Sequence, residues 1–119
     1  MADYAYGIVK PAIEKCLNMY SSLHGLDYGI ARPSNPYGEG QRNTMQGAVT
    51  IFADRALRGE EIEIWGDGTV IRDFMYIGDA VSGIAAVAGH KGPNRTFNIG
   101  SGEGHSLNEV LRIIEKIVG

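Results

Sequence analysis

Residues 65–76 constrain the fold of this chain more than any other stretch. The Gly-Asp-Gly sequence at residues 66–68 predicts a tight turn, because glycine adopts positive φ angles at no steric cost and aspartate hydrogen-bonds its own backbone. A short strand is expected before the turn, at residues 62–65, where apolar and charged residues alternate. A second strand is expected after it, at residues 70–77, which are rich in β-branched and aromatic residues. We therefore expect two strands joined by a tight turn.

The second of these strands carries an adjacent charged pair, Arg72 and Asp73, in its apolar middle. One interpretation is a surface ion pair on an edge strand, which contributes roughly 0–1 kcal/mol. The other is an arginine fork presented beside an aromatic ring, an arrangement that suits a phosphate attached to a flat base. The stretch by itself leaves both interpretations open.

The rest of the chain alternates between helical and strand patterns, which predicts an α/β fold. Helices are expected at residues 4–23, 46–58, 79–88 and from residue 106 onward, and further strands at residues 26–31 and 96–99. Residues 34–44, rich in Gly, Pro and Asn, are expected to form a loop. The helix at 4–23 is apolar on two sides, so it requires a partner, either preceding sequence or another subunit.

Composition excludes several functional classes. The chain is 44% hydrophobic with a net charge of −3 and no basic cluster, as expected of a soluble cytoplasmic protein that binds no nucleic acid. No apolar stretch reaches the length of a membrane span, and a single cysteine, Cys16, excludes an intramolecular disulfide. The three histidines are too widely spaced for a local metal motif, so no metal site is expected.

Some residues invite a chemical interpretation on their own. Tyr6 and Lys10 lie four apart on the expected first helix, where the ammonium would lower the pKa of the phenol; an ordinary exposed helix pair has the same spacing. Asn35 follows a predicted strand, where open α/β sheets bind ligands, although a turn between two prolines is the more frequent role. We interpret residues 100–104 as a structural turn, because Glu103 would repel a phosphate.

Five patches, in this order and spacing, resemble the NAD-dependent nucleotide-sugar epimerase/dehydratase family of extended short-chain dehydrogenases, and most of all its UDP-glucose 4-epimerases. The patches are residues 6–10, 32–38, 64–68, 72–79 and 97–102. The resemblance covers essentially the whole chain. It implies part of a dinucleotide-binding fold: residues 1–119 would be a single C-terminal segment, with a catalytic helix at 4–23 and a substrate-binding region at 27–119.

The resemblance also implies what this chain lacks. The family's Gly-x-x-Gly-x-x-Gly loop is not in the sequence, so the N-terminal Rossmann half is expected to be missing. Without the helix terminus that binds the pyrophosphate, the 119 residues are expected to bind NAD weakly or not at all and to be inactive alone. Since the family usually dimerises through the catalytic helix, a homodimer or a swapped oligomer through residues 4–23 is expected.

The resemblance assigns roles to seven residues. Tyr6 resembles the catalytic tyrosine that removes the sugar hydroxyl proton as NAD takes the hydride, and Lys10 the lysine that acidifies it and binds the nicotinamide ribose. Pro33 and Ser34 match positions close to the nicotinamide of the NAD cofactor. The substrate, a nucleotide sugar of the UDP-hexose type, would be bound by Asn35 and Arg72 at its diphosphate and by Trp65 at its base.

Other functions stay open at this stage. The leading interpretation is the substrate-binding part of an epimerase that oxidises the sugar transiently at C4 and returns the hydride to the other face. A non-catalytic module that binds a nucleotide sugar or another protein is the first alternative. A fragment of a nucleotide-sugar 4,6-dehydratase, decarboxylase or reductase is the second, because in the family most residues that discriminate these reactions lie near the Ser/Thr partner of the catalytic tyrosine, which this sequence does not contain.

Overall fold

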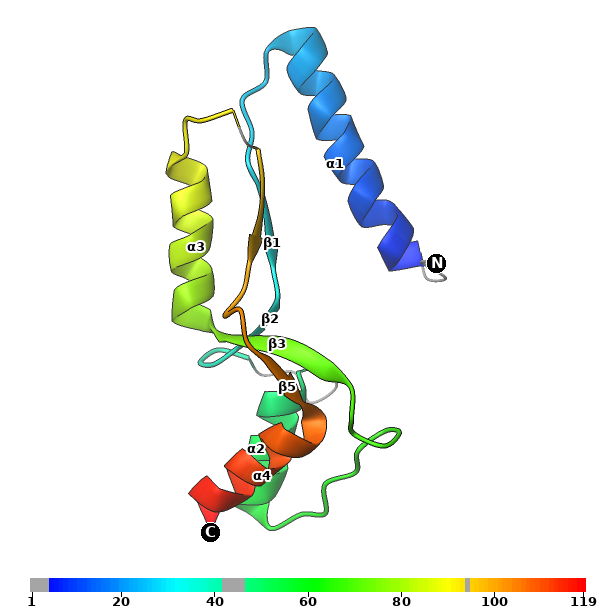
Figure 1. Ribbon diagram of the computed structural model, residues 1–119, viewed down its shortest axis with the longest axis vertical. Helices are drawn as coiled ribbons and strands as arrows, with labels where there is room; N and C mark the ends of the chain where they lie inside the picture. Colours follow the sequence, from blue (N-terminus) through cyan, green and yellow to red (C-terminus); the bar gives the residue numbers. More distant parts are fainter. Residues whose placement is uncertain (1–4, 42–46, 94) are drawn as a thin grey trace.

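The computed structural model describes residues 5–41, 47–93 and 95–119, and its helices and strands alternate along the chain (Figure 1). The elements are α1 (Ala5–His24), β1 (Ile30–Pro33), β2 (Asn35–Tyr37), α2 (Ala48–Arg58), β3 (Ile71–Tyr76), α3 (Ile77–Gly89), β4 (Thr96–Ile99), β5 (Gly104–Ser106) and α4 (Leu107–Val118). The α/β class expected from the sequence is confirmed.

Within the described residues the strands form two small sheets. β1 pairs in parallel with β4, from Ile30 opposite Thr96 to Pro33 opposite Ile99. β3 is the central strand of the other sheet, with β2 parallel on one side and β5 antiparallel on the other. Ser34 is the single residue between β1 and β2, so the chain passes directly from one sheet into the other.

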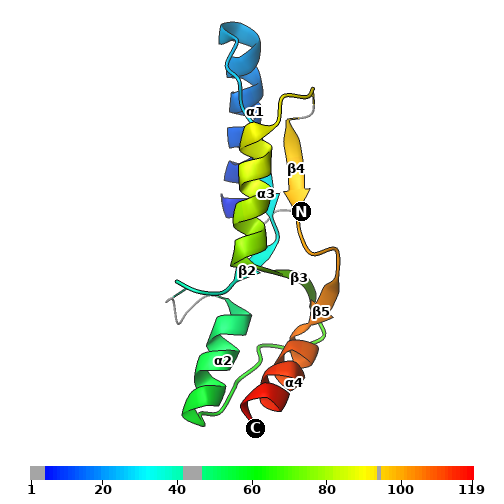
Figure 2. The ribbon, with the colours of Figure 1, turned by 90° about the vertical axis from the view of Figure 1, so that its left-hand side faces the viewer.

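The molecule is elongated. It measures 56 × 31 × 24 Å and its radius of gyration is 17.6 Å, whereas a compact chain of this length has a radius of about 13–14 Å. Figures 1 and 2 show α3 running beside β1 and β4 in one half, and α2 and α4 side by side in the other. α1 stands apart from both halves (Figure 1). Much apolar surface therefore stays exposed, more of it on α1 than on any other element.

The main hydrophobic core lies between α2 and α4. Phe52, Val110 and Ile114 are buried there, and half-buried side chains from the segment before β3, Ile62 and Ile64 among them, pack around these three. This core joins the two helices into one unit beneath the three-stranded sheet.

The ends of two helices agree with their sequence signals. α2 ends at Gly59, whose φ of 66° lies in the left-handed region and whose N–H donates to the Ala56 carbonyl at 3.1 Å. α4 begins with the expected capping box: Glu109 N donates to Ser106 Oγ at 3.2 Å, and Ser106 N donates to Glu109 Oε2 at 2.7 Å. α1 runs from Ala5 to His24 as one helix that includes Pro11.

Two strand expectations need correction. The strand expected at residues 62–65 is wrong, because those residues pair with no strand among the described residues. The apolar residues of this alternating stretch, Ile62 and Ile64, pack instead on the core between α2 and α4. The strand expected at 26–31 begins only at Ile30 and extends to Pro33.

Two short strands were not expected. β2 occupies part of the loop predicted at residues 34–44, of which residues 42–46 lie outside the described part of the chain. β5 occupies the end of the glycine-rich turn before α4. Both are three residues long, so no periodicity reveals them; they form because β3 presents hydrogen-bonding edges on both sides.

Candidate functional site

Asn35 and Arg72 line one cavity of about 360 Å³ between the three-stranded sheet and the first residues of α2 and α4. The sheet side of this cavity is formed by Phe74 and Asn35. Phe74 follows Arg72 by two residues, so both lie on the same face of β3, and Asn35 is the partner of Phe74 in β2. Leu107 closes it from α4. The cavity thus brings an arginine and an asparagine amide together over an apolar floor.

Trp65 lines the adjoining cavity, of about 420 Å³, with Arg55 and Glu63. The two cavities share Gly47, Ala48 and Leu107 as walls. The indole is 87% exposed. Arg72 and Trp65 therefore lie in neighbouring hollows joined by common residues, and not in a single one.

Arg72 and Asp73 do not pair with each other. β3 is a central strand, so the interpretation as an ion pair on an edge strand is wrong. Successive side chains of a strand point to opposite faces, which sends Arg72 to the cavity and Asp73 to the other side. Arg72 Nη1 donates to the carbonyl oxygen of Ile71 at 2.9 Å, and its side chain is exposed. The interpretation of Arg72 as an arginine fork for a phosphate stays a prediction.

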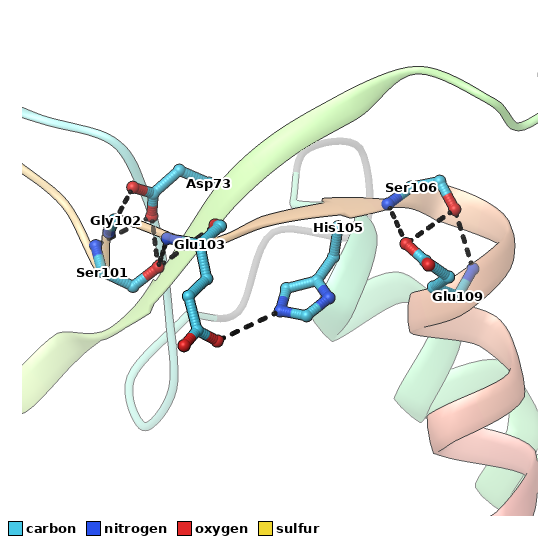
Figure 3. Close-up of polar contacts among 7 residues, drawn as sticks. All are labelled: Asp73, Ser101, Gly102, Glu103, His105, Ser106 and Glu109. Atoms are coloured by element: carbon cyan, nitrogen blue, oxygen red, sulfur yellow. Dashed lines mark hydrogen bonds and ion pairs between the residues drawn. The ribbon is translucent and has the colours of Figure 1, made fainter.

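The Asp73 carboxylate holds the two sheets together (Figure 3). Its oxygens accept hydrogen bonds from Ser101 N at 2.9 Å, Ser101 Oγ at 2.9 Å, Gly102 N at 3.0 Å and Ser34 Oγ at 3.1 Å. These bonds, the one from Ser101 N foremost, hold the pKa of the Asp73 carboxyl below its usual value against partial desolvation. The turn at 100–104 is therefore structural, as expected, because an internal carboxylate occupies its N–H groups.

Asn35 is held on β3, and Ser34 is held on both β3 and β4. The Asn35 amide nitrogen donates to the Asp73 carbonyl at 2.9 Å, and Ser34 N donates to Ile99 O at 2.8 Å. Pro33, opposite Ile99 in the parallel pair, is exposed. Pro33 and Ser34, expected at the cofactor, are therefore followed directly by Asn35, expected at the diphosphate. All three lie where the chain passes from one sheet into the other.

Tyr6 and Lys10 lie one turn apart near the start of α1. Lys10 is exposed, and the side chain of Tyr6 lies outside what the structure describes. An ion pair between Glu14 and Arg32 connects α1 to the end of β1, with Arg32 Nε at 2.7 Å from Glu14 Oε1. The hydrogen bonds from Arg32 lower the pKa of the Glu14 carboxyl and raise that of the guanidinium. No local pattern in the sequence marks this pair, because its partners are eighteen residues apart.

The glycine turn at residues 100–104 is not free to bind the pyrophosphate of a dinucleotide. Lys10 and Pro33 are exposed and could face a nicotinamide ribose. The Ser34 hydroxyl is held by Asp73, and so are the N–H groups of the glycine turn that could otherwise bind a pyrophosphate. The pyrophosphate end of the cofactor would therefore have to be bound by residues other than this turn.

Clusters of metal-ligating side chains and membrane-length apolar helices are both absent from the described part of the chain. No group of three or more His, Cys, Asp or Glu side chains there is placed to hold a metal ion. Within the same residues, each helix is too short or too polar to cross a membrane.

Comparison with known proteins gives a consistent result. The family model described as "NAD dependent epimerase/dehydratase family" matches residues 2–100. UDP-glucose 4-epimerase of Mycolicibacterium smegmatis is 36% identical over 119 residues, covering 99% of this chain and 37% of that protein. dTDP-4-dehydro-6-deoxyglucose reductase of Escherichia coli is 35% identical over 117 residues, covering 97% of this chain and 37% of that protein.

A solved structure agrees with this match. The crystal structure of UDP-glucose 4-epimerase with UDP-glucose from Thermotoga maritima superposes with a TM-score of 0.85 at 38% identity, over 96% of this chain and 37% of that one. The chain thus spans little more than a third of the length of the proteins it matches.

Proposed function

Because this chain belongs to the NAD dependent epimerase/dehydratase family, we propose that it is the nucleotide-sugar binding part of an epimerase of the UDP-glucose 4-epimerase type. The observation that supports this most is the cavity lined by both Asn35 and Arg72. A guanidinium binds phosphate oxygens through paired N–H donors, and an amide adds a neutral donor beside it. Trp65, in the adjoining cavity, offers an exposed aromatic surface on which a base can stack.

α1 carries the proposed chemistry. The phenolate oxygen of Tyr6 accepts the proton of the sugar hydroxyl and becomes a neutral phenol, and the ammonium of Lys10, one turn away, favours the phenolate form. NAD would supply the exchange of a hydride with the sugar carbon. The 119 residues contain no glycine loop for its pyrophosphate, so this chain alone is proposed to bind the nucleotide sugar without turning it over.

Arg72→Ala tests this function. Hydrogen bonds to charged groups contribute about 1.5–3 kcal/mol, so the variant is expected to bind UDP-glucose roughly 10- to 100-fold more weakly by isothermal titration calorimetry. Arg112→Ala is the matched control, because Arg112 is an exposed arginine of α4 that lines neither cavity. Equal affinities of the two variants would contradict the assignment of Arg72 to the diphosphate.

We further propose that α1 mediates self-association, as a homodimer or a swapped oligomer. Six large apolar side chains of α1 are exposed: Ile8, Val9, Ile13, Met19, Tyr20 and Leu23. Soluble monomers rarely expose contiguous apolar patches of more than a few hundred Å², so six such side chains on one helix favour a partner that covers them. Light scattering is expected to give at least twice the monomer mass, and the double variant Ile13→Glu/Tyr20→Glu the monomer mass. Lys15→Glu on the same helix is the control, and a monomeric wild-type chain would contradict the proposal.

A further inference from the structure

Two titratable residues, Glu103 and His105, lie next to Arg72 and indicate how binding there depends on pH. This inference rests on the proposed function. His105 of β5 lies directly opposite Arg72 of β3 in the antiparallel ladder. Side chains directly opposite in such a pair share one face of the sheet, with Cβ atoms about 4.5–5.5 Å apart. The imidazole of His105 is therefore an immediate neighbour of the side chain proposed to bind the diphosphate.

His105 has a carboxylate partner. Glu103 Oε2 lies 3.9 Å from His105 Nε2, and the two side chains face each other beside β5 (Figure 3). With a neutral imidazole the pair carries one negative charge next to Arg72, which opposes binding of an anion. With a protonated imidazole the pair is neutral. One proton thus removes a unit of negative charge beside the diphosphate site.

The other charged groups near His105 keep their charge between pH 5 and 8. Glu109, on the first turn of α4, accepts hydrogen bonds from Ser106, which hold the pKa of its carboxyl below the usual value. Asp73 points to the opposite face of β3, where its hydrogen bonds also lower the pKa of its carboxyl. An arginine guanidinium is charged at every pH in this range. Among these groups, only a histidine ordinarily changes charge between pH 5 and 8.

We propose that the Glu103–His105 pair makes nucleotide-sugar binding at Arg72 proton-dependent, with higher affinity when His105 is protonated. His105 lines neither the cavity that contains Asn35 nor the one that contains Trp65. It therefore acts through its charge and not as a direct ligand. The pair's unit charge lies beside the residue that would bind the phosphate and is partly screened by water. A charge so placed changes the affinity for the nucleotide sugar by about three- to tenfold.

The test is calorimetric titration of the wild-type chain with UDP-glucose between about pH 5.5 and 8. UDP-glucose is the suitable probe, because its diphosphate keeps a constant charge across this range. Affinity is expected to rise three- to tenfold as the pH falls, and titrations in buffers of different ionisation enthalpy are expected to show proton uptake. His24→Gln, at the far end of α1, is the matched control and is expected to keep both effects.

Two variants separate the contributions of His105 and Glu103 to the pH dependence of binding. His105→Gln is expected to bind with the weaker affinity at every pH and without proton uptake. Glu103→Gln is expected to bind at pH 8 about as tightly as the wild type binds at pH 5.5. A wild-type affinity that does not change with pH, or a His105→Gln variant that retains the pH dependence, overturns the inference alone. Absence of UDP-glucose binding at any pH overturns the proposed function together with it.

Discussion

Phe52→Ala is expected to destabilise the chain by about 3–5 kcal/mol, the range for truncating a buried aromatic side chain. Phe52 is 5% exposed and lies with Val110 and Ile114 at the centre of the core between α2 and α4. Domains of this size unfold at a cost of only about 5–15 kcal/mol. In an elongated chain with a small core, the loss of this side chain removes a large fraction of that stability.

The measurement is urea unfolding followed by circular dichroism, with Leu57→Ala as the control. Leu57 lies on the same helix but is 73% exposed, so its truncation is expected to change stability by no more than about 0.5 kcal/mol. If both variants unfold at the same urea concentration, the contact between α2 and α4 is not what stabilises this half of the molecule.

Gly68→Ala is expected to have the next largest effect. Gly68 has a φ of 71°, a region that costs an alanine about 1–2 kcal/mol. A Cβ atom there would also clash with Asn108 Oδ1. The Asn108 side chain cannot rotate away without breaking its bond from Nδ2 to Asp67 O at 2.9 Å, and a shift of its backbone would also break the bond from N to Gly68 O at 3.1 Å. Each such bond contributes about 0.5–1.5 kcal/mol.

Gly66→Ala isolates the steric part of this prediction. Gly66 also has a positive φ, of 84°, but a Cβ atom there would meet nothing within 4 Å. Gly66→Ala therefore carries the backbone cost alone, and Gly68→Ala is expected to be less stable than it by about 1–3 kcal/mol. Equal melting temperatures would show that Asn108 does not clamp the turn to α4.

The local signals of this sequence predicted the helices well. The capping box of Ser106 and Glu109 and the terminal glycine of α2, Gly59, act within one turn of chain, so the residues that form them are adjacent in sequence. The alternating residues 62–65 predicted the wrong element because apolar alternation reports only that one side is buried. It does not distinguish a sheet partner from the helices that bury Ile62 and Ile64 in this fold.

The candidate site was predictable in part. Asn35 and Arg72 meet because each belongs to a strand of the same sheet, and only the strand of Arg72 was visible as a pattern in the sequence. The partners of Asp73 and the ion pair of Arg32 with Glu14 were not predictable, because they depend on tertiary contacts between distant residues. The catalytic, cofactor and substrate roles assigned through the family resemblance stay predictions.

β3 passes into α3 with no loop, since Tyr76 ends the strand and Ile77 begins the helix. A flexible joint is thus absent between the strand that carries Arg72 and a helix whose Val81 and Ile84 side chains are exposed to solvent. The direction of the helix axis and the direction of β3 are consequently coupled through the backbone. A shift of α3 would thereby also displace the backbone of the strand that carries Arg72.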